Sequence, residues 1–218
     1  WRDKDSTWIA FDAATGSRRF ELATDRWAPL QANDDVIVTI DDDTLVAYDT
    51  TDGKARWRSE IEVRSPLLLS GARLFVRLDD DRLGVFTASS GALQRRIDPG
   101  GTGPFRGFRG TKPRLAANAK QVGWVHDDVL SVADASSGKV RFTKEGAELL
   151  AMSDAVVVAT FGPDVVGFDP ESGSQKWKFE APDDPDSVAV RGDVVAVRAG
   201  ELLVLDAQSG KKRFSLAP

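Results

Sequence analysis

The sequence predicts an all-β fold, a β-propeller built from four-stranded antiparallel blades. Three observations lead to this fold class. A ten-residue frame recurs six times along the 218 residues. Short apolar segments bounded by turn residues separate the frames, and no segment repeats its apolar residues with the 3.6-residue period of a helix. The frames follow one another at intervals of 35 to 47 residues, which is the range of propeller blades.

The frame starts with an apolar residue and an aspartate, has a glycine four residues after the aspartate, and ends on an aromatic residue four positions later. Aspartate is replaced once, by Thr87, and the aromatic residue once, by Arg95. Glycine fills its position in every copy, with spacings of 37, 38, 47, 35 and 37 residues. The frames are FDAATGSRRF (11–20), YDTTDGKARW (48–57), FTASSGALQR (86–95), ADASSGKVRF (133–142), FDPESGSQKW (168–177) and LDAQSGKKRF (205–214), with glycines Gly16, Gly53, Gly91, Gly138, Gly173 and Gly210.

Each frame is interpreted as the turn of a β-hairpin. The aspartate accepts hydrogen bonds from the backbone just after it, as in an Asx turn. The glycine supplies the positive φ that closes a four-residue loop. The strand after the turn carries the aromatic residue, such as Trp57 or Trp177.

Three further apolar segments fill each period. After Gly53 they are 64–70, 73–78 and 82–86, and after Gly16 they are 28–33, 36–40 and 44–48. Together with the aromatic-bearing strand they make four short strands, A to D, joined by Asp, Gly, Asn and Ser turns. Such a unit is one propeller blade.

The same alignment assigns 7–11 to strand C of the first blade, with no strand A before it. The visible chain therefore holds five complete blades and half of another, in a single domain spanning 1–218. Since a missing inner strand would leave unpaired backbone facing the channel, we expect further strands before Trp1 and a ring of seven or eight blades. A six-bladed ring is the alternative.

Composition narrows the function classes. A net charge of −5 and a pI near 5.0 disfavour a nucleic-acid partner. No run of 18 apolar residues is present, so no membrane insertion is expected. The absence of cysteine excludes disulfides and thiolate metal sites, and no calcium-loop pattern is found, so no metal site and no cofactor are predicted.

The expected B–C turns are acidic, and two readings stay open for them. Aspartate favours tight turns, and an acidic rim would also attract a cation or a basic partner. Strand direction alternates, so these turns share one face with the D–A connections. The residues are Asp41, Asp42, Asp43, Asp79, Asp80 and Asp81, followed by Asp127, Asp128 and Asp164.

The longest D–A connection, 99–113, lies in the 47-residue period and falls on that same face. It is either a tolerated surface insertion or a recognition loop whose aromatic and arginine side chains anchor a protein partner. Its candidate binding residues are Phe105, Arg106, Phe108 and Arg109, together with Lys112.

Catalytic patterns are lacking. His126 is the single histidine, and a lone imidazole beside a turn is expected at the surface. No Ser-His-Asp order and no glycine-rich phosphate loop can be built. The chain is therefore predicted not to be an enzyme.

From Ala47 through Asp49 and Gly53 to Trp57, and again from Asp169 to Trp177, the frames resemble the tryptophan-docking signature of the PQQ-like β-propeller repeats, the quinoprotein-type and BamB-like family. In that family the last aromatic residue packs between neighbouring blades. The resemblance implies this role for Trp57, with Phe20, Phe142, Trp177 and Phe214 as its equivalents.

The resemblance also implies a function class. We expect a non-catalytic protein-binding, scaffold or sensor module of a bacterial protein, in the periplasm or outside the cell. The alternatives are a degenerate quinoprotein-like enzyme domain and a small-ligand sensor. Quinoprotein enzymes of the family carry a vicinal disulfide and calcium ligands, whereas this chain has no cysteine.

Overall fold

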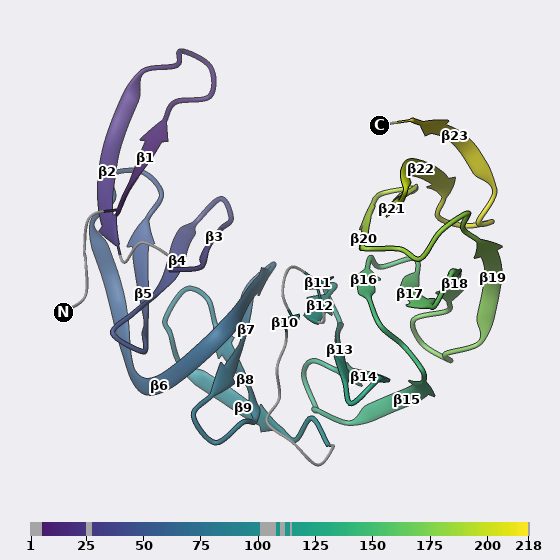
Figure 1. Ribbon diagram of the computed structural model, residues 1–218. Coiled ribbons are helices and arrows are strands. Elements are labelled where there is room, and N and C mark those ends of the chain that lie inside the picture. Colours follow the sequence, from purple (N-terminus) through teal and green to yellow (C-terminus); the bar gives the residue numbers. More distant parts are fainter. Residues whose placement is uncertain (1–5, 25–27, 101–107, 110–111, 114, 218) are drawn as a thin grey trace. The chain divides into compact units, whose positions relative to one another are not determined.

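The computed structural model describes residues 6–24, 28–100, 108–109, 112–113 and 115–217 (Figure 1). The chain divides into two compact units, Trp1–Ile97 and Asp98–Pro218, and each is described by itself. Every regular element of the described residues is a β-strand. The prediction of an all-β chain without a helix is confirmed for these residues.

The first unit contains a two-stranded hairpin and a seven-stranded antiparallel sheet. The hairpin pairs β1 (Ser6–Phe11) with β2 (Arg18–Thr24), where strands C and D of the incomplete first blade are expected. The large sheet follows chain order. Its strands are β3 (Leu30–Ala32), β4 (Val36–Asp41), β5 (Thr44–Asp49), β6 (Ala55–Ser70), β7 (Arg73–Leu78), β8 (Leu83–Thr87) and β9 (Leu93–Ile97).

Strand β6 belongs to two four-stranded halves of this sheet. Its first part, from Ala55 to Glu62, pairs with β5, and its second part, from Val63 to Ser70, pairs with β7. Two separate strands were expected here. No Gly, Asn or Asp lies between Lys54 and Ser70, and Ser65 and Pro66 produce a shift of register between Arg64 and Leu67 without ending the strand.

The second unit contains three separate four-stranded antiparallel sheets in chain order, which Figure 1 shows in teal, green and yellow. Their innermost strands lie beside one another, β12 next to β16 and β16 next to β20. The strands are β12 (Leu115–Ala117), β13 (Gln121–His126), β14 (Val129–Asp134), β15 (Val140–Glu145), β16 (Leu150–Met152), β17 (Val157–Phe161), β18 (Asp164–Phe168), β19 (Gln175–Glu180), β20 (Ser187–Arg191), β21 (Val194–Ala199), β22 (Glu201–Asp206) and β23 (Lys212–Leu216).

The long connection 99–113 is partly structured. Strand β10 (Phe108–Arg109) pairs antiparallel with β11 (Lys112–Pro113), and the backbone of β11 lies close to that of β20. The Pro99 carbonyl accepts a 2.9 Å hydrogen bond from the indole N–H of the buried Trp124. The sequence left a tolerated surface insertion and a recognition loop as alternatives for this segment, and the structure shows that its described parts contact the second unit.

The apolar cores lie between successive sheets. One core joins β16–β19 to β20–β23 and contains Trp177, Leu203 and Leu205. Another joins β12–β15 to β16–β19, and in the first unit a third joins the two halves of the large sheet. Strand β13 lies between β12 and β14 within its sheet, and all six of its residues are buried.

The frames form the predicted turns. Asp134 Oδ1, for example, accepts hydrogen bonds from the amides of Ser136 and Ser137 at 3.0 and 2.7 Å, and the Gly138 amide donates to the Asp134 carbonyl at 2.8 Å. All six frame glycines have φ between 66° and 71°, so the predicted positive φ is confirmed. The frames join β1–β2, β5–β6, β8–β9, β14–β15, β18–β19 and β22–β23.

Candidate functional site

The frame aromatic residue of one sheet packs on the frame glycine of the next. A Cβ added to Gly210 would lie 2.6 Å from the Trp177 ring, and one added to Gly91 would lie 2.5 Å from Trp57. Both indoles also donate a hydrogen bond to the next frame, Trp177 to the Ala207 carbonyl at 2.9 Å and Trp57 to that of Ala88 at 3.0 Å. Phe20 contacts Gly53 and Phe142 contacts Gly173 in the same way.

Each tryptophan also needs a small residue beneath it in its own sheet. Trp177 is paired with Gly167 and Trp57 with Ala47. A Cβ on Gly167 would lie 2.2 Å from the Trp177 ring. Where the frame aromatic residue is phenylalanine, the paired residue can be larger, as Val132 opposite Phe142 shows. The sequence analysis did not identify this dependence of the frame aromatic residue on the size of its paired residue. The paired residue lies two positions before the frame aspartate, as Gly167 and Ala47 do.

A basic residue directly before the frame aromatic links neighbouring sheets. Arg141 pairs with Asp134 of its own frame at 2.9 Å and with Glu171 of the next frame. Lys176 donates to the side chain of Gln208 at 3.0 Å. This position was also missed, yet it is basic in five of the six frames, as Arg19, Arg56, Arg141, Lys176 and Arg213, with Gln94 as the exception.

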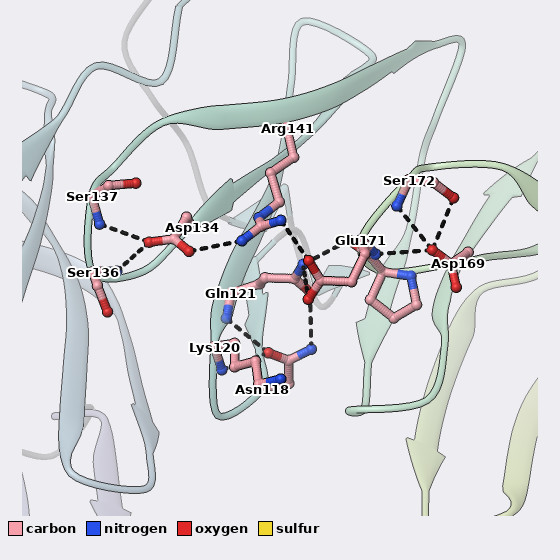
Figure 2. Close-up of polar contacts among 11 residues, drawn as sticks. Asn118, Lys120, Gln121, Asp134, Ser136, Ser137, Arg141, Asp169, Glu171 and Ser172 are labelled. Atoms are coloured by element: carbon pink, nitrogen blue, oxygen red, sulfur yellow. Dashed lines mark hydrogen bonds and ion pairs between the residues drawn. The ribbon is translucent and has the colours of Figure 1, made fainter.

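Figure 2 shows the polar contacts that join the β12–β15 and β16–β19 sheets. The buried Gln121 donates a 2.6 Å hydrogen bond to the Pro170 carbonyl of the next frame. Asn118 donates to Gln121 Oε1 at 3.2 Å and to the Ser153 carbonyl at 3.0 Å. The Gln121 side chain thus bonds the main-chain carbonyl of Pro170, and the Asn118 side chain bonds that of Ser153.

Replacing Gln121 with methionine is expected to lower the free energy of unfolding by about 1–3 kcal/mol, because the Pro170 carbonyl would stay buried without its donor. Methionine keeps the length of the side chain, so little volume is lost. Urea unfolding measures the change, with Gln94→Met on the exposed strand β9 as the control. Equal stability of the two variants would contradict this role of Gln121.

The frame carboxylates are strongly stabilised in their charged form. Hydrogen bonds from the Ser137 amide and from the Arg141 guanidinium hold the pKa of Asp134 well below its usual range. At Asp206 the Arg213 guanidinium and the Ser209 hydroxyl lower the pKa in the same direction. These carboxylates remain ionised throughout the physiological range.

Asp134→Asn is expected to destabilise the protein at pH 7 and to have a shrinking effect in acid. Because the pKa of Asp134 is lower in the folded state, its contribution is present above the unfolded pKa of about 3.9. It is lost as the pH falls toward the folded value. Urea unfolding at several pH values measures the difference from wild type, with Asp79→Asn as the control for loss of one exposed charge. A difference that grows in acid would contradict this assignment.

The acidic B–C turns of the first unit are tight turns with arginines around them. Asp42 and Asp43 have positive φ, at 50° and 58°, as the two central residues of a type I′ hairpin turn require. In the second turn Asp81 alone has positive φ, at 62°. Their neighbours carry balancing charge, and the ion pairs are Arg58–Asp41, Arg64–Asp43, Arg77–Asp81, Arg82–Asp80 and Arg96–Asp80.

The predicted acidic rim is thus a surface of mixed charge in this unit. The same turn geometry recurs in the second unit at Asp127 and Asp128, and Asp164 pairs with Lys178 at 2.7 Å. The turn-forming role of these aspartates is observed directly. Their role in binding stays a prediction.

The residues expected to bind from the 99–113 segment are only partly described. Phe105 and Arg106 lie outside the described residues. Phe108 and Arg109 form β10, of which the backbone alone is described. Their role as anchors therefore stays a prediction, whereas the hairpin itself is observed.

His126 was expected at the surface, and that expectation is wrong. It is buried at the end of β13, with Nε2 3.8 Å from a carboxylate oxygen of Asp127. The reason is its place on an inner strand, between β12 and β14, of which all six residues are buried. Among the described residues, no group of three or more His, Asp and Glu side chains is arranged to hold a metal ion.

The chain forms consecutive antiparallel sheets, and each repeat has an Asp-to-Gly turn whose aromatic residue packs on the next repeat. These features define a PQQ-like β-propeller repeat protein. The family model described as "Outer membrane protein assembly factor BamB" matches residues 4–110 and 110–217. The chain belongs to this family. The described residues contain no helix of the length and apolar character that would cross a membrane.

Two solved structures share this fold. BamB from Moraxella catarrhalis has a TM-score of 0.54 and 17% identity, over 100% of this chain and 92% of that one. The computationally designed Ika8 protein has a TM-score of 0.71 and 18% identity, over 99% of this chain and 70% of the other. No curated protein matches the sequence.

Proposed function

We propose that the chain is a non-catalytic scaffold propeller module that binds a protein partner in the periplasm or outside the cell. The observation that carries the proposal is the match of an assembly-factor family to both halves of the chain. We further propose that its blades form part of a seven- or eight-bladed ring. The partner class follows the family description, a component of outer-membrane protein assembly.

The recognition surface in this proposal is the face that carries the B–C turns and the D–A connections. In the second unit it combines the turn aspartates Asp127 and Asp128, and the ion pair of Asp164 with Lys178, with the 99–113 segment. Mixed charge with nearby aromatic residues is suited to protein recognition, because aromatic and arginine side chains are the commonest energetic anchors of interfaces. The segment is also the largest departure from the repeat period.

Phe105→Ala combined with Phe108→Ala is expected to weaken partner binding by more than about 1 kcal/mol, roughly a fivefold rise in Kd. The melting temperature and circular dichroism spectrum should stay nearly unchanged. A pull-down from the source organism identifies the partner, and calorimetric titration then compares the variants. Shortening 100–110 while keeping Pro99 and β11 should have the same effect, since the bond to Trp124 is retained.

Val140→Ala is the matched control, because Val140 is an exposed apolar residue on β15, outside this face. Unchanged binding by both 99–113 variants would contradict the recognition role of that segment. Binding of PQQ with calcium, seen as cofactor absorbance that co-purifies with the protein, would instead favour a quinoprotein-like activity.

A further inference from the structure

Strand β11 lies beside a strand that is far from it in the sequence. It directly precedes β12, the inner strand of the first sheet of the second unit. Its backbone nevertheless lies close to that of β20, the inner strand of the third sheet. Between β12 and β20 lies β16, the inner strand of the second sheet. The segment 99–113 therefore connects the first and third sheets of this unit past the second.

Both ends of this segment belong to the first sheet. At its start, the Pro99 carbonyl accepts a 2.9 Å hydrogen bond from the indole N–H of Trp124 on β13. At its end, the chain enters β12 at Leu115. The contact of β11 with β20 is thus an additional connection, which neither the blade repeat nor the chain order requires.

The connection that leads into β20 is an acidic loop with a fixed position. The amides of Ala181 and Asp186, near its two ends, donate hydrogen bonds of 2.9 Å to main-chain carbonyls of the second and third sheets. Pro185 is buried, whereas Asp183, Asp184 and Asp186 are exposed. The loop therefore presents its carboxylates to solvent directly before β20.

Only one of these carboxylates is neutralised by a described residue. Asp186 pairs with Arg198 at 2.7 Å. Asp183 accepts a 2.9 Å hydrogen bond from the amide of Asp184, and neither of these two aspartates forms an ion pair within the described part of the chain. The loop therefore keeps a net negative charge.

The inserted segment has the opposite charge. Residues 99–114 contain three arginines, one lysine and no acidic residue, whereas residues 181–186 contain three aspartates and no basic residue. Opposite charges attract over a Debye length, about 8 Å at physiological salt, so a direct ion pair is not required. Because β11 lies beside the strand that the acidic loop enters, the two charged segments are brought together.

We propose that β11 is a clasp that ties the first sheet of the second unit to the third. It is held beside β20 by attraction between the basic residues of 99–114 and the aspartates of 181–186. In the proposed function the clasp orders the segment before a partner arrives, which lowers the entropy cost of binding. The clasp itself does not depend on that function, and its tests need no partner.

Cross-linking tests the position of the clasp. The chain has no cysteine, so Pro113→Cys with Ser187→Cys supplies the only two thiols and leaves every charge in place. A short bifunctional maleimide should join positions 113 and 187 within one chain, at least about tenfold faster than it joins the matched pair Pro113→Cys with Gln175→Cys. Gln175 is exposed on β19, as Ser187 is on β20. Equal rates for the two pairs would overturn the proposal.

Charge substitution tests what holds the clasp. Asp183→Asn with Asp184→Asn, added to the 113–187 pair, should slow cross-linking about threefold, the effect of losing a surface charge pair. Raising the salt from about 0.1 M to about 1 M shortens the Debye length from roughly 10 Å to 3 Å and should slow the unsubstituted pair in the same way.

Two controls accompany this test. Asp34→Asn with Asp35→Asn removes two exposed charges from a turn of the first unit and should leave the rate unchanged. Labelling with a monofunctional maleimide corrects for the reactivity of each thiol, and circular dichroism checks that each variant folds. A corrected rate that responds neither to salt nor to the loss of Asp183 and Asp184 would overturn the proposal.

Discussion

Trp177→Ala is expected to lower the free energy of unfolding by about 3–5 kcal/mol, the range for a buried tryptophan removed from a core. Trp177 is 6% exposed and lies between Gly167 of its own sheet and Gly210 of the next. Neither glycine has a side chain that could fill the space, so the cavity would persist. The indole bond to the Ala207 carbonyl would be lost as well.

Chemical unfolding measures this loss, and two further variants separate its causes. Trp177→Phe keeps most of the ring and loses the hydrogen bond, so its cost should fall to roughly 0.5–1.5 kcal/mol for that bond plus a small packing loss. Trp8→Ala removes an indole that is 48% exposed and should cost far less. If Trp8→Ala proved as damaging as Trp177→Ala, the docking role of Trp177 would be wrong.

Gly210→Ala is expected to be strongly destabilising. A left-handed conformation costs an alanine roughly 1–2 kcal/mol, and here φ is 66°. The new Cβ would also lie 2.6 Å from the Trp177 ring, so the indole would have to leave its place between the sheets.

Gly192→Ala in the same sheet is the matched control. Its φ is 59°, and no described atom lies within 4 Å of an added Cβ, so it reports backbone strain alone. The difference between the two variants measures the displaced tryptophan. Hydrogen exchange should rise in β19 and β22 for Gly210→Ala only, and equal stability of the two variants would rule out the clash.

The hairpin frames could be predicted because their determinants are local. The turn needs an aspartate and a glycine four residues apart, and both the hydrogen bonds of Asp134 and the positive φ of Gly138 follow from that spacing. The four-stranded sheets followed from the regular apolar segments between the frames. These features depend on neighbours within a few residues.

Other features depend on contacts between frames, and sequence reasoning missed them. Gln121 reaches Pro170, 49 residues away, and no short-range pattern marks such a pair. His126 was misplaced because a turn in the sequence suggested exposure, whereas the inner strand β13 that carries it is buried at all six residues. The basic residue before each aromatic residue had a visible signal in the repeat. The binding role of 99–113 depends on the surface of a partner as well as on this chain, and it stays a prediction.

Strand β6 has a consequence for limited proteolysis. Most junctions between sheets in such a chain are loops, and exposed loops are the preferred sites of nicking. The junction between the two halves of the large sheet has no loop, because β6 continues as one strand from Ala55 to Ser70 and pairs first with β5 and then with β7. Arg58 and Arg64 are accessible trypsin residues on this strand, yet cleavage after them requires the sheet to open first. The segment from Pro182 to Asp186, between β19 and β20, is an ordinary loop. A protease that cuts at aspartate, such as Asp-N, should therefore separate the last sheet from its neighbour well before trypsin divides the large sheet.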